Sequence, residues 1–519
     1  MPQNALIWLK RDLRLHDHAP LAAAADFDEA AALYVIEPAW LASPECDSSH
    51  VAFVLNGLAE LREGLAKRGL PLLVRVGEVR AVFDDLRAHF RFTDLLSHEE
   101  TGSGWSYDRD RAVAAWCHER SVRWREWPQN GVVRGLRSRD GWARRWHTRM
   151  AAPQVLPPVG FRGASGLRLE ALPDLAALGL APHEKTLQPA GEGAASETLR
   201  SFLDHRGHGY LKAISSPLSA EAGGSRLSPY LAFGMLSMRT AHQATEAWIA
   251  RSDDAVAKRA LRGFAGRLRW HCHFMQKLES QPSMEFRNLA RSVDGLREGE
   301  FNRIHFEAWC AGQTGYPMVD ACMRSLHATG WLNFRMRAML VSFASYHLWL
   351  HWREPGLYLA RQFLDFEPGI HWSQLQMQSG TTGINALRMY SPTKQAREHD
   401  PRGVFIRRWL PELTRVPLPL LAEPWRLTIG QQRVAGCVIG EDYPAPLIDE
   451  RSALAHARQR LYDARRVLDA RREADAIQQQ HGSRRGAVTR APGKPCKTQG
   501  RASRHGTITP CPQGDLFTS

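Results

Sequence analysis

The sequence predicts two folded units in series: an α/β domain with a doubly wound, Rossmann-like parallel sheet, and then a larger all-α domain. Apolar runs of strand length alternate with helical periods from residue 5 to residue 127. Almost every later segment, to about Arg472, keeps a helical period with turns at Gly and Pro. A chain of 519 residues with 44 % hydrophobic content can bury two separate cores.

The strand-like runs of the first unit fall at 5–9, 32–36, 71–76, 93–98 and 122–127, and helical periods lie at 51–68, 82–90 and 109–120. Ligands of a doubly wound sheet bind at the carboxyl ends of its strands. Here those ends carry the segments KRDLR (10–14) and HEETG (98–102). No GxGxxG follows the first strand, so we do not expect a standard dinucleotide site.

Composition places the domain boundaries. Residues 1–150 form the α/β domain, and a Pro-, Gly- and Ala-rich linker occupies 151–195, with one helical turn expected around Leu172 to Leu178. The all-α domain takes 196–475. The remaining segment, 476–519, is rich in Arg, Gly, Ser and Pro without periodicity, and we expect it to be a basic, disordered tail.

Charge and cysteine usage narrow the class of protein. The formal net charge of +14 favours a polyanionic partner. The eight cysteines form no CxxC pair, which indicates free thiols in a reducing cytosol and no metal site. The N-terminus does not read as a signal peptide, and the longest apolar run, 338–350, is too short to span a bilayer. We expect a cytoplasmic, nucleoid-associated protein without membrane contact.

The segment 309–339 contains an aromatic residue and two arginines that could bind ligands. A break at Thr329-Gly330 puts Trp331 at the start of a helix that also carries Arg335 and Arg337. Two arginines two positions apart on a helix point in different directions, so they can serve different partners. One can face an anionic cofactor and the other the phosphates of a large ligand. A core helix with snorkelling arginines is the alternative that needs no ligand.

Two other segments suit an anionic ligand. The run GSRLS (224–228) precedes a helix, and backbone N–H groups there would hold a phosphate; in the alternative, Ser228 is only an N-cap. Asp365 and Glu367 lie two residues apart in a turn, where one carboxylate can pair with Arg337 in a buried contact. A surface salt bridge or a helix cap would explain the same two residues.

Four motifs, in this order, resemble the photolyase/cryptochrome family of flavoproteins: WLKRDLRLHDHAPL (8–21), GGSRLSPYLAFGML (223–236), GQTGYPMVDACMRSLHATGWLNFRMR (312–337) and RMYSPTKQAREHDPRGVFIRRWLPEL (388–413). The resemblance extends to about Tyr443. It implies FAD bound in the helical domain and a monomeric deoxyribodipyrimidine photo-lyase. Such an enzyme repairs UV-induced pyrimidine dimers in damaged DNA by light-driven electron transfer from reduced FAD to the flipped-out lesion.

The resemblance assigns cofactor contacts motif by motif. Residues 224–228 and Tyr210 would hold the pyrophosphate side, and Arg337 would pair with Asp365 beside the isoalloxazine. Glu367 would contact the ribityl or ribose hydroxyls, and His371 would face flavin N5. The implied cofactor set is Tyr210, Gly224, Ser225, Arg226, Leu227, Ser228, Arg337, Asp365, Phe366, Glu367 and His371.

The resemblance also assigns a lesion site, in which Trp270 and Trp331 stack on the flipped-out dimer. The implied DNA- and lesion-binding set is Arg267, Trp270, His271, Trp331, Arg335 and Gln395, and the implied catalytic set is Trp352, His371 and Trp331. Arg267 and His271 stand where the best-known repair class has Glu and Arg. Two alternatives therefore stay open: repair of the (6-4) photoproduct, and a cryptochrome-like blue-light receptor with FAD photoreduction and little or no repair.

The family's three-tryptophan electron relay is incomplete in this sequence. Only its middle member, Trp352, has a clear match, and Trp372 or Trp349 would replace the inner one. The family also implies an antenna chromophore in the N-terminal domain, most often a folate such as methenyltetrahydrofolate. Its contacts here would come from residues 98–100 or from Tyr107 and Asp108.

The extreme C-terminus, Gln513 to Phe517 (QGDLF), resembles the short peptide by which DNA-repair proteins dock on the bacterial sliding clamp. An incidental Leu-Phe pair is the alternative.

Overall fold

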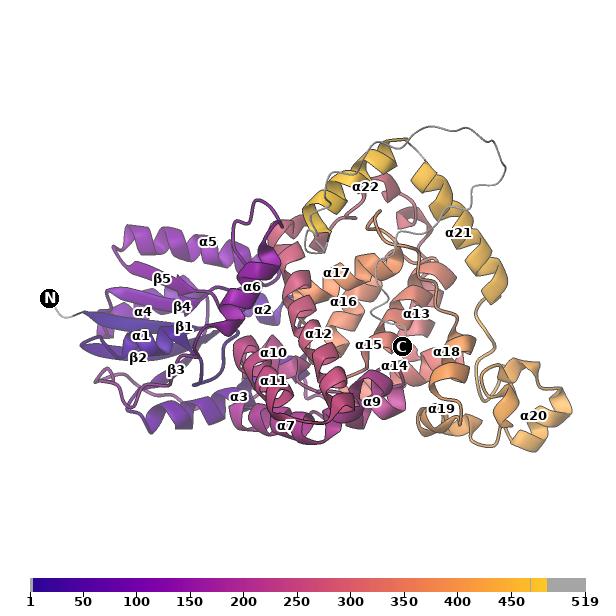
Figure 1. Ribbon diagram of the computed structural model, residues 1–519, viewed down its shortest axis with the longest axis horizontal. Coiled ribbons are helices and arrows are strands. Elements are labelled where there is room, and N and C mark those ends of the chain that lie inside the picture. The colour runs from indigo at the N-terminus through magenta and orange to yellow at the C-terminus, as the bar shows by residue number, and fades with distance from the viewer. Residues whose placement is uncertain (1–2, 467, 483–519) are drawn as a thin grey trace.

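The computed structural model describes residues 3–466 and 468–482, and it shows an α/β unit followed by a larger helical unit (Figure 1). The segment proposed to dock on a sliding clamp, 513–517, lies outside the described residues. Within the described ranges, no helix combines the length and the apolar character that a bilayer crossing requires.

The α/β unit contains one five-stranded parallel sheet in the order β3-β2-β1-β4-β5. Its strands are β1 (Asn4–Leu9), β2 (Glu29–Ile36), β3 (Leu72–Val76), β4 (Asp94–His98) and β5 (Arg123–Trp127). The predicted fold class is therefore confirmed. The strand order reverses between β1 and β4, which makes the carboxyl ends of these two strands the topological switch point of the sheet.

Each face of the sheet is covered by helices because alternate strand residues point to opposite sides. On one face, Leu6 and Trp8 share a core with α4 (Val79–His89) and α5 (Gly104–Glu119). On the other face, Ile7 and Leu9 share a core with α1 (Ala19–Ala24) and α3 (Ser48–Ala66).

The second of these cores continues into the helical unit without a break. Phe53 of α3 packs against Tyr230 and Phe233, with ring centroids 6.0 and 5.7 Å apart, and the same cluster reaches Phe202 and Phe264. The two units are thus joined by a shared apolar core as well as by the linker.

The helical unit uses glycine and proline to set the helix limits around the site. Gly330 (φ 66°) ends α14, and Pro368 and Gly380 (φ 78°) bound α17, because a left-handed residue stops a helix and a first-turn proline starts one. The helices are α7 (Glu192–Asp204), α8 (Tyr210–Ala213), α9 (Pro217–Gly223), α10 (Ser228–Ala232), α11 (Met238–Arg251), α12 (Ala255–Ser280), α13 (Arg303–Ala311), α14 (Pro317–Thr329), α15 (Phe334–Ser342), α16 (Arg353–Gln362), α17 (Pro368–Ser379), α18 (Pro392–His399), α19 (Val404–Trp409), α20 (Ile429–Ala435), α21 (Glu450–Arg466) and α22 (Leu468–His481).

The structure departs from the sequence interpretation at three places. It adds helix α6 (Trp142–Ala151), whose residues Trp142, Trp146 and Met150 are buried at helical spacing between charged positions. Helix α7 begins inside the range assigned to the linker, and the turn expected there is a single hydrogen-bonded turn from Asp174 to Leu178. The prediction of a disordered tail from 476 is wrong for residues up to 481, because α22 extends to that point.

The loop that follows β1 docks the sheet onto the helical unit. The Leu13 amide donates to the Phe233 carbonyl at 3.2 Å, and the buried Arg14 guanidinium donates to the Gly234 carbonyl at 3.0 Å. Gly234 has φ 65°, and a Cβ placed there would lie 2.0 Å from the Arg11 carbonyl oxygen. The docking therefore requires glycine at this position.

Gly234→Ala should lower the free energy of unfolding by about 3 kcal/mol or more, because left-handed strain adds to a backbone clash. Gly166→Ala is the control, since Gly166 has φ 76° but no atom lies within 4 Å of the added Cβ. That variant should lose only about 1 kcal/mol in urea unfolding. Equal losses in the two variants would contradict this account of the docking loop.

Candidate functional site

An ion pair between the partly buried Arg337 of α15 and the buried Asp365, in the turn before α17, forms the centre of the site. Arg337 Nη1 and Nη2 lie 2.8 and 2.9 Å from the two carboxylate oxygens of Asp365, and the guanidinium stacks 4.0 Å above the Phe363 ring. Burial alone would raise the pKa of Asp365, but Arg337 and the Ser228 hydroxyl hold it below its usual value. The expected pairing is present, and Asp365 is ionised at neutral pH.

Residues from distant motifs face this pair. The Ser228 hydroxyl hydrogen-bonds Asp365, and the Arg226 guanidinium, which also faces Asp365, lies 4.0 Å above the Trp331 ring. Ser228 is the first residue of the five-residue α10, whose N-cap is Leu227, so the alternative of a serine N-cap does not hold. Leu227 itself is buried in the shared core and offers the site only its main chain.

Glu367 adds a second carboxyl group, and its pKa is shifted in the direction opposite to that of Asp365. Its Oε1 lies 3.9 Å from Arg11 Nη1, which is too far for a hydrogen bond, and has no hydrogen-bond partner among the described residues. Burial raises the pKa of Glu367 to about 7 because the distant Arg11 offsets only part of the desolvation cost. A buried oxygen without a partner in this position suits a hydroxyl-bearing ligand.

His371 sits on α17 beside the ion pair. Its Nε2 must carry a proton, because it donates to the Gly356 carbonyl at 2.8 Å, and a carbonyl only accepts. Burial lowers the pKa of His371 to about 3, so the imidazole is neutral at physiological pH. The ring packs against Trp372, with centroids 4.8 Å apart.

Of the two tryptophans considered as replacements in the relay, Trp372 adjoins both the site and the matched residue. Its ring lies 5.9 Å from that of Trp352, whose Nε1 donates to Asn288 at 2.7 Å. Trp349 instead lies under Arg297 at 4.4 Å and against α21. The geometry therefore favours Trp372 as the neighbour of Trp352.

Helix α12 carries three of the lesion-site candidates, and they point to different sides of the helix. Arg267 contacts the phenol of the buried Tyr210, and the His271 ring faces Asp365. Burial lowers the pKa of His271 to about 4, which leaves it neutral. Trp270 points to another side of the helix, where its ring packs 4.8 Å from that of His273.

The two arginines of α15 diverge as the sequence predicts. Arg337 turns to Asp365, whereas Arg335 faces His399 at the end of α18. Gln395, on the same helix α18, is buried. The structure thus brings Arg335 and α18 together, away from the ion pair.

Three of the expected cofactor residues, Phe366, Tyr210 and Gly224, contact other parts of the protein. The Phe366 ring lies between His371, at 5.1 Å, and His50, at 6.5 Å, while its carbonyl accepts from Arg11. Tyr210 is buried against aromatic neighbours, and the Gly224 carbonyl accepts from Arg206.

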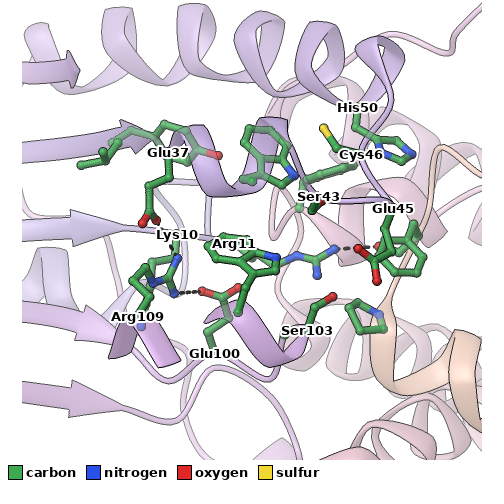
Figure 2. Close-up of a pocket in the computed structure, with 18 of the residues that line it drawn as sticks. Lys10, Arg11, Glu37, Ser43, Glu45, Cys46, His50, Glu100, Ser103 and Arg109 are labelled. Carbon is green, nitrogen blue, oxygen red and sulfur yellow. Dashed lines mark hydrogen bonds and ion pairs between the residues drawn. The ribbon is translucent and has the colours of Figure 1, made fainter. Parts of the chain in front are cut away.

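A separate cavity opens at the carboxyl ends of β1 and β4, where the switch point predicts a ligand (Figure 2). Its volume is about 770 Å³, including the part open to solvent. Arg109 pairs there with Glu37 at 3.0 Å and Glu100 at 2.6 Å, and Trp8, Trp40 and Trp105 supply aromatic walls.

Of the residues suggested for an antenna contact, only Glu100 lines this cavity. The His98 ring hydrogen-bonds Asp12, the Tyr107 hydroxyl donates to Glu279, and Asp108 pairs with Arg111. The other polar residues that line this cavity were not identified from the sequence. Their only signal in the sequence is that they follow strands whose carboxyl ends lie near the switch point. They include Glu37, Ser43, Glu45, Ser103 and Arg109.

Among the described residues, one group has the ligand types and spacing of a metal site: Asp12, His18 and His98. His98 Nδ1 hydrogen-bonds Asp12 Oδ2 at 2.8 Å, and His18 Nε2 lies 3.0 Å from the same oxygen without hydrogen-bond geometry. His18 Nδ1 also accepts from the Leu21 amide at the start of α1. These contacts explain the cluster as a buried hydrogen-bonded carboxylate.

Glu367→Gln should remove one component of the pH dependence of stability in the ligand-free protein. With a pKa of about 7 in the folded state and 4.5 as the ordinary value, the carboxyl keeps its proton longer when folded. Its stabilisation is complete below pH 4.5 and falls by about 3 kcal/mol as the pH rises to 7. The variant should show a shallower fall in urea unfolding. Glu184→Gln, at an exposed position, should keep the wild-type profile, and an unchanged Glu367→Gln profile would contradict the assignment.

Comparison with known protein families adds independent evidence. Residues 5–138 match the family model described as DNA photolyase, and residues 264–463 match the FAD binding domain of DNA photolyase. The deoxyribodipyrimidine photo-lyase of Escherichia coli K12 is 30 % identical over 476 residues, covering 86 % of this chain and 96 % of that protein. Cryptochrome DASH of Gloeobacter violaceus is 27 % identical over 492 residues, covering 89 % and 96 % respectively.

Among solved structures, a bacterial class III photolyase from Agrobacterium tumefaciens has the same fold. The TM-score is 0.79 at 22 % identity, over 90 % of this chain and 98 % of that one. The residues present also fit the cofactor that the second family model names. The unpartnered Glu367 Oε1 suits a hydroxyl, and the cations Arg226 and Arg337 suit an anionic group. The chain is therefore an FAD-binding member of the photolyase/cryptochrome family.

Proposed function

We propose that this protein is a light-driven lyase that repairs UV-induced pyrimidine dimers in DNA. One observation carries the proposal: residues of the lesion motifs lie within the cluster that suits FAD. Trp331 stacks under Arg226, and His271 faces Asp365. A lesion held by these side chains would therefore be adjacent to the cofactor.

In this proposal the Arg337–Asp365 pair orients the cofactor's ring system, and Arg226 with Ser228 holds its phosphates. The free Oε1 of Glu367 accepts a hydrogen bond from a sugar or ribityl hydroxyl. His371 stays neutral, so it brings no full charge to the ring. When bound and reduced, FAD supplies the light-driven electron that splits the dimer.

The protein's part in repair is to extrude the lesion and hold it. Trp270 and Trp331 would stack on the flipped-out dimer, and a kinked, poorly stacked dimer is a few kcal/mol cheaper to flip than normal bases. Arg267, with its guanidinium at the Tyr210 hydroxyl, stands where the best-known repair class has Glu, and it would donate hydrogen bonds to the dimer's carbonyl groups. The net charge of +14 supports salt-dependent contacts with DNA phosphates.

We place an antenna chromophore in the cavity at the ends of β1 and β4, and a folate fits its aromatic and acidic lining. Three tryptophans could stack on a planar ring. Phe366 and Pro368 also line this cavity, so its occupant would touch the turn that carries Asp365 and Glu367.

A blue-light receptor is the second candidate function, and Arg267 and His271 favour it because they replace the usual lesion contacts. A relative named cryptochrome DASH covers this chain as fully as the photo-lyase does. Both candidates require FAD, so cofactor binding does not distinguish them. Action on the lesion does.

The test uses FAD-loaded, fully reduced protein, blue light, and an oligonucleotide with one cyclobutane thymine dimer. We expect recovery of intact thymines under light and none in a dark control, as measured by chromatography of the digested strand. Failure on this substrate, with normal FAD photoreduction, would redirect the proposal to the (6-4) photoproduct. Failure on both lesions would reject the repair function in favour of the receptor.

A further inference from the structure

Two buried tryptophans beside the candidate cofactor site have opposite electrostatic surroundings. Trp352 is the N-cap of α16 and Trp372 lies on α17, and these two helices pack side by side in the helical unit (Figure 1). Both side chains are fully buried, and their ring centroids are 5.9 Å apart. Trp372 also packs against His371, with centroids 4.8 Å apart, so it is the member of the pair that adjoins the site.

The surroundings of Trp372 oppose a positive charge on its ring. The Arg353 guanidinium lies 4.3 Å from the ring centroid, and a cation there stabilises the neutral indole but repels an oxidised one. Glu45 offsets this cation only in part, because its carboxylate lies 3.9 Å from Arg353 Nη2. Trp372 Nε1 has no hydrogen-bond partner in the described part of the chain, so no acceptor there stabilises a positive indole.

The surroundings of Trp352 favour a positive charge. Trp352 Nε1 donates to Asn288 Oδ1 at 2.7 Å. Asn288 Nδ2 donates in turn to Asp294 Oδ1 at 2.9 Å and to Glu298 Oε1 at 3.4 Å. The two carboxylates polarise the amide of Asn288, which makes its oxygen a stronger acceptor for an indole N–H that gains positive charge.

Glu298 supplies the less compensated of these two negative charges. Asp294 forms an ion pair with Arg291 at 2.6 Å. Among the described residues, the only ion-pair contact of Glu298 is His351, at 3.8 Å, and burial lowers the pKa of His351, so its imidazole is neutral at pH 7. Burial alone would raise the pKa of Glu298, but backbone N–H groups hold it below its usual value, so its carboxylate is ionised.

We propose that Trp372 and Trp352 form a directed path for one-electron oxidation, with Asn288 and Glu298 as the positioning residues that hold the positive charge on Trp352. The oxidant is a photoexcited oxidised flavin, to which Trp372 gives one electron. Trp352 then gives one electron to Trp372 and is left as a radical cation. No bond forms or breaks, and Trp352 keeps its proton because the amide oxygen of Asn288 accepts hydrogen bonds but is not a base.

This path ends where the charge is stabilised. In the described part of the chain, the rings in contact with Trp352 are those of Trp372 and His351, so no further tryptophan receives the positive charge. A partly exposed carboxylate, Glu298, takes the place of a third carrier. The inference requires bound FAD, but it holds equally for a repair enzyme and for a receptor.

The first experiment follows the tryptophan radical cation by transient absorption after a flash on the oxidised, FAD-loaded protein, without DNA. Glu298→Gln keeps an acceptor for Asn288 and removes the charge. Its radical cation should therefore disappear about threefold faster than that of the wild type, as expected for the loss of one partly exposed charge. In Trp352→Phe the radical cation should stay on Trp372, beside the flavin, and disappear faster still.

Glu300→Gln is the matched control. Its side chain is 47 % exposed, against 41 % for that of Glu298, and it pairs with Arg460 at 2.7 Å rather than with Asn288. This variant should keep the wild-type lifetime. Three results would overturn the proposal: no tryptophan radical cation in the wild type, an unchanged lifetime in Glu298→Gln, or the same shortening in Glu300→Gln. Because no DNA is present, a failure of repair leaves these outcomes unaffected.

The second experiment reads the hydrogen bond of Trp352 in the dark, by nuclear magnetic resonance of FAD-loaded protein that contains isotope-labelled tryptophan. The indole N–H signal of Trp352 is identified by its loss in Trp352→Phe. Glu298→Gln should move this signal upfield, because the amide of Asn288 becomes less polarised, whereas Glu300→Gln should leave it in place. A purely structural role of Glu298 would change stability without this shift, so an unmoved signal in Glu298→Gln would contradict the role assigned to it.

Discussion

Arg11 connects the two domains at the point where both candidate ligand sites meet. Its Nε donates to the Ala232 carbonyl at 2.9 Å and its Nη2 to the Phe366 carbonyl at 2.7 Å. Phe366 lies between the two carboxylates of the site, Asp365 and Glu367. A side chain of the α/β domain therefore holds in place the turn that carries the helical domain's acidic residues. The Arg11 side chain also lines the cavity of Figure 2, so that cavity and the site share one wall.

The same turn shows how geometry separates two chemically similar groups. Asp365 meets Arg337 in a bidentate contact and stays ionised, whereas Glu367 meets Arg11 only at 3.9 Å and gains proton affinity from burial. Two carboxyls two residues apart thus have pKa values shifted in opposite directions. One is suited to fixing a charge and the other to exchanging hydrogen bonds with a ligand.

The fold was predictable where local periodicity is strong. All five strands follow strand-like runs visible in the sequence, and the divergence of Arg335 and Arg337 follows from helical geometry alone. Helix α6 was missed because its apolar residues, Trp142, Trp146 and Met150, stand between arginines that mask the helical period. The end of α22 was missed because its polar sequence resembles that of a tail.

The candidate site was predictable where a motif carries it, as for the Arg337–Asp365 pair. It was not predictable where residues meet only through tertiary structure. Phe366 packs against His371 and also lines the other cavity, and Glu37 and Arg109 pair across 72 positions. Helix α12 and its C-cap Gln281 likewise contact residues more than 130 positions away on both sides, at Arg139 and His481.

The central claim is that the protein recognises a DNA lesion beside its cofactor, and dark binding tests it most directly. The FAD-loaded protein would be titrated with a duplex containing one cyclobutane thymine dimer and with the same duplex undamaged, at one salt concentration. We expect the damaged duplex to bind at least about tenfold more tightly, because its dimer is cheaper to flip and, in our proposal, would stack on Trp270 and Trp331. Equal affinity for the two duplexes would contradict the claim.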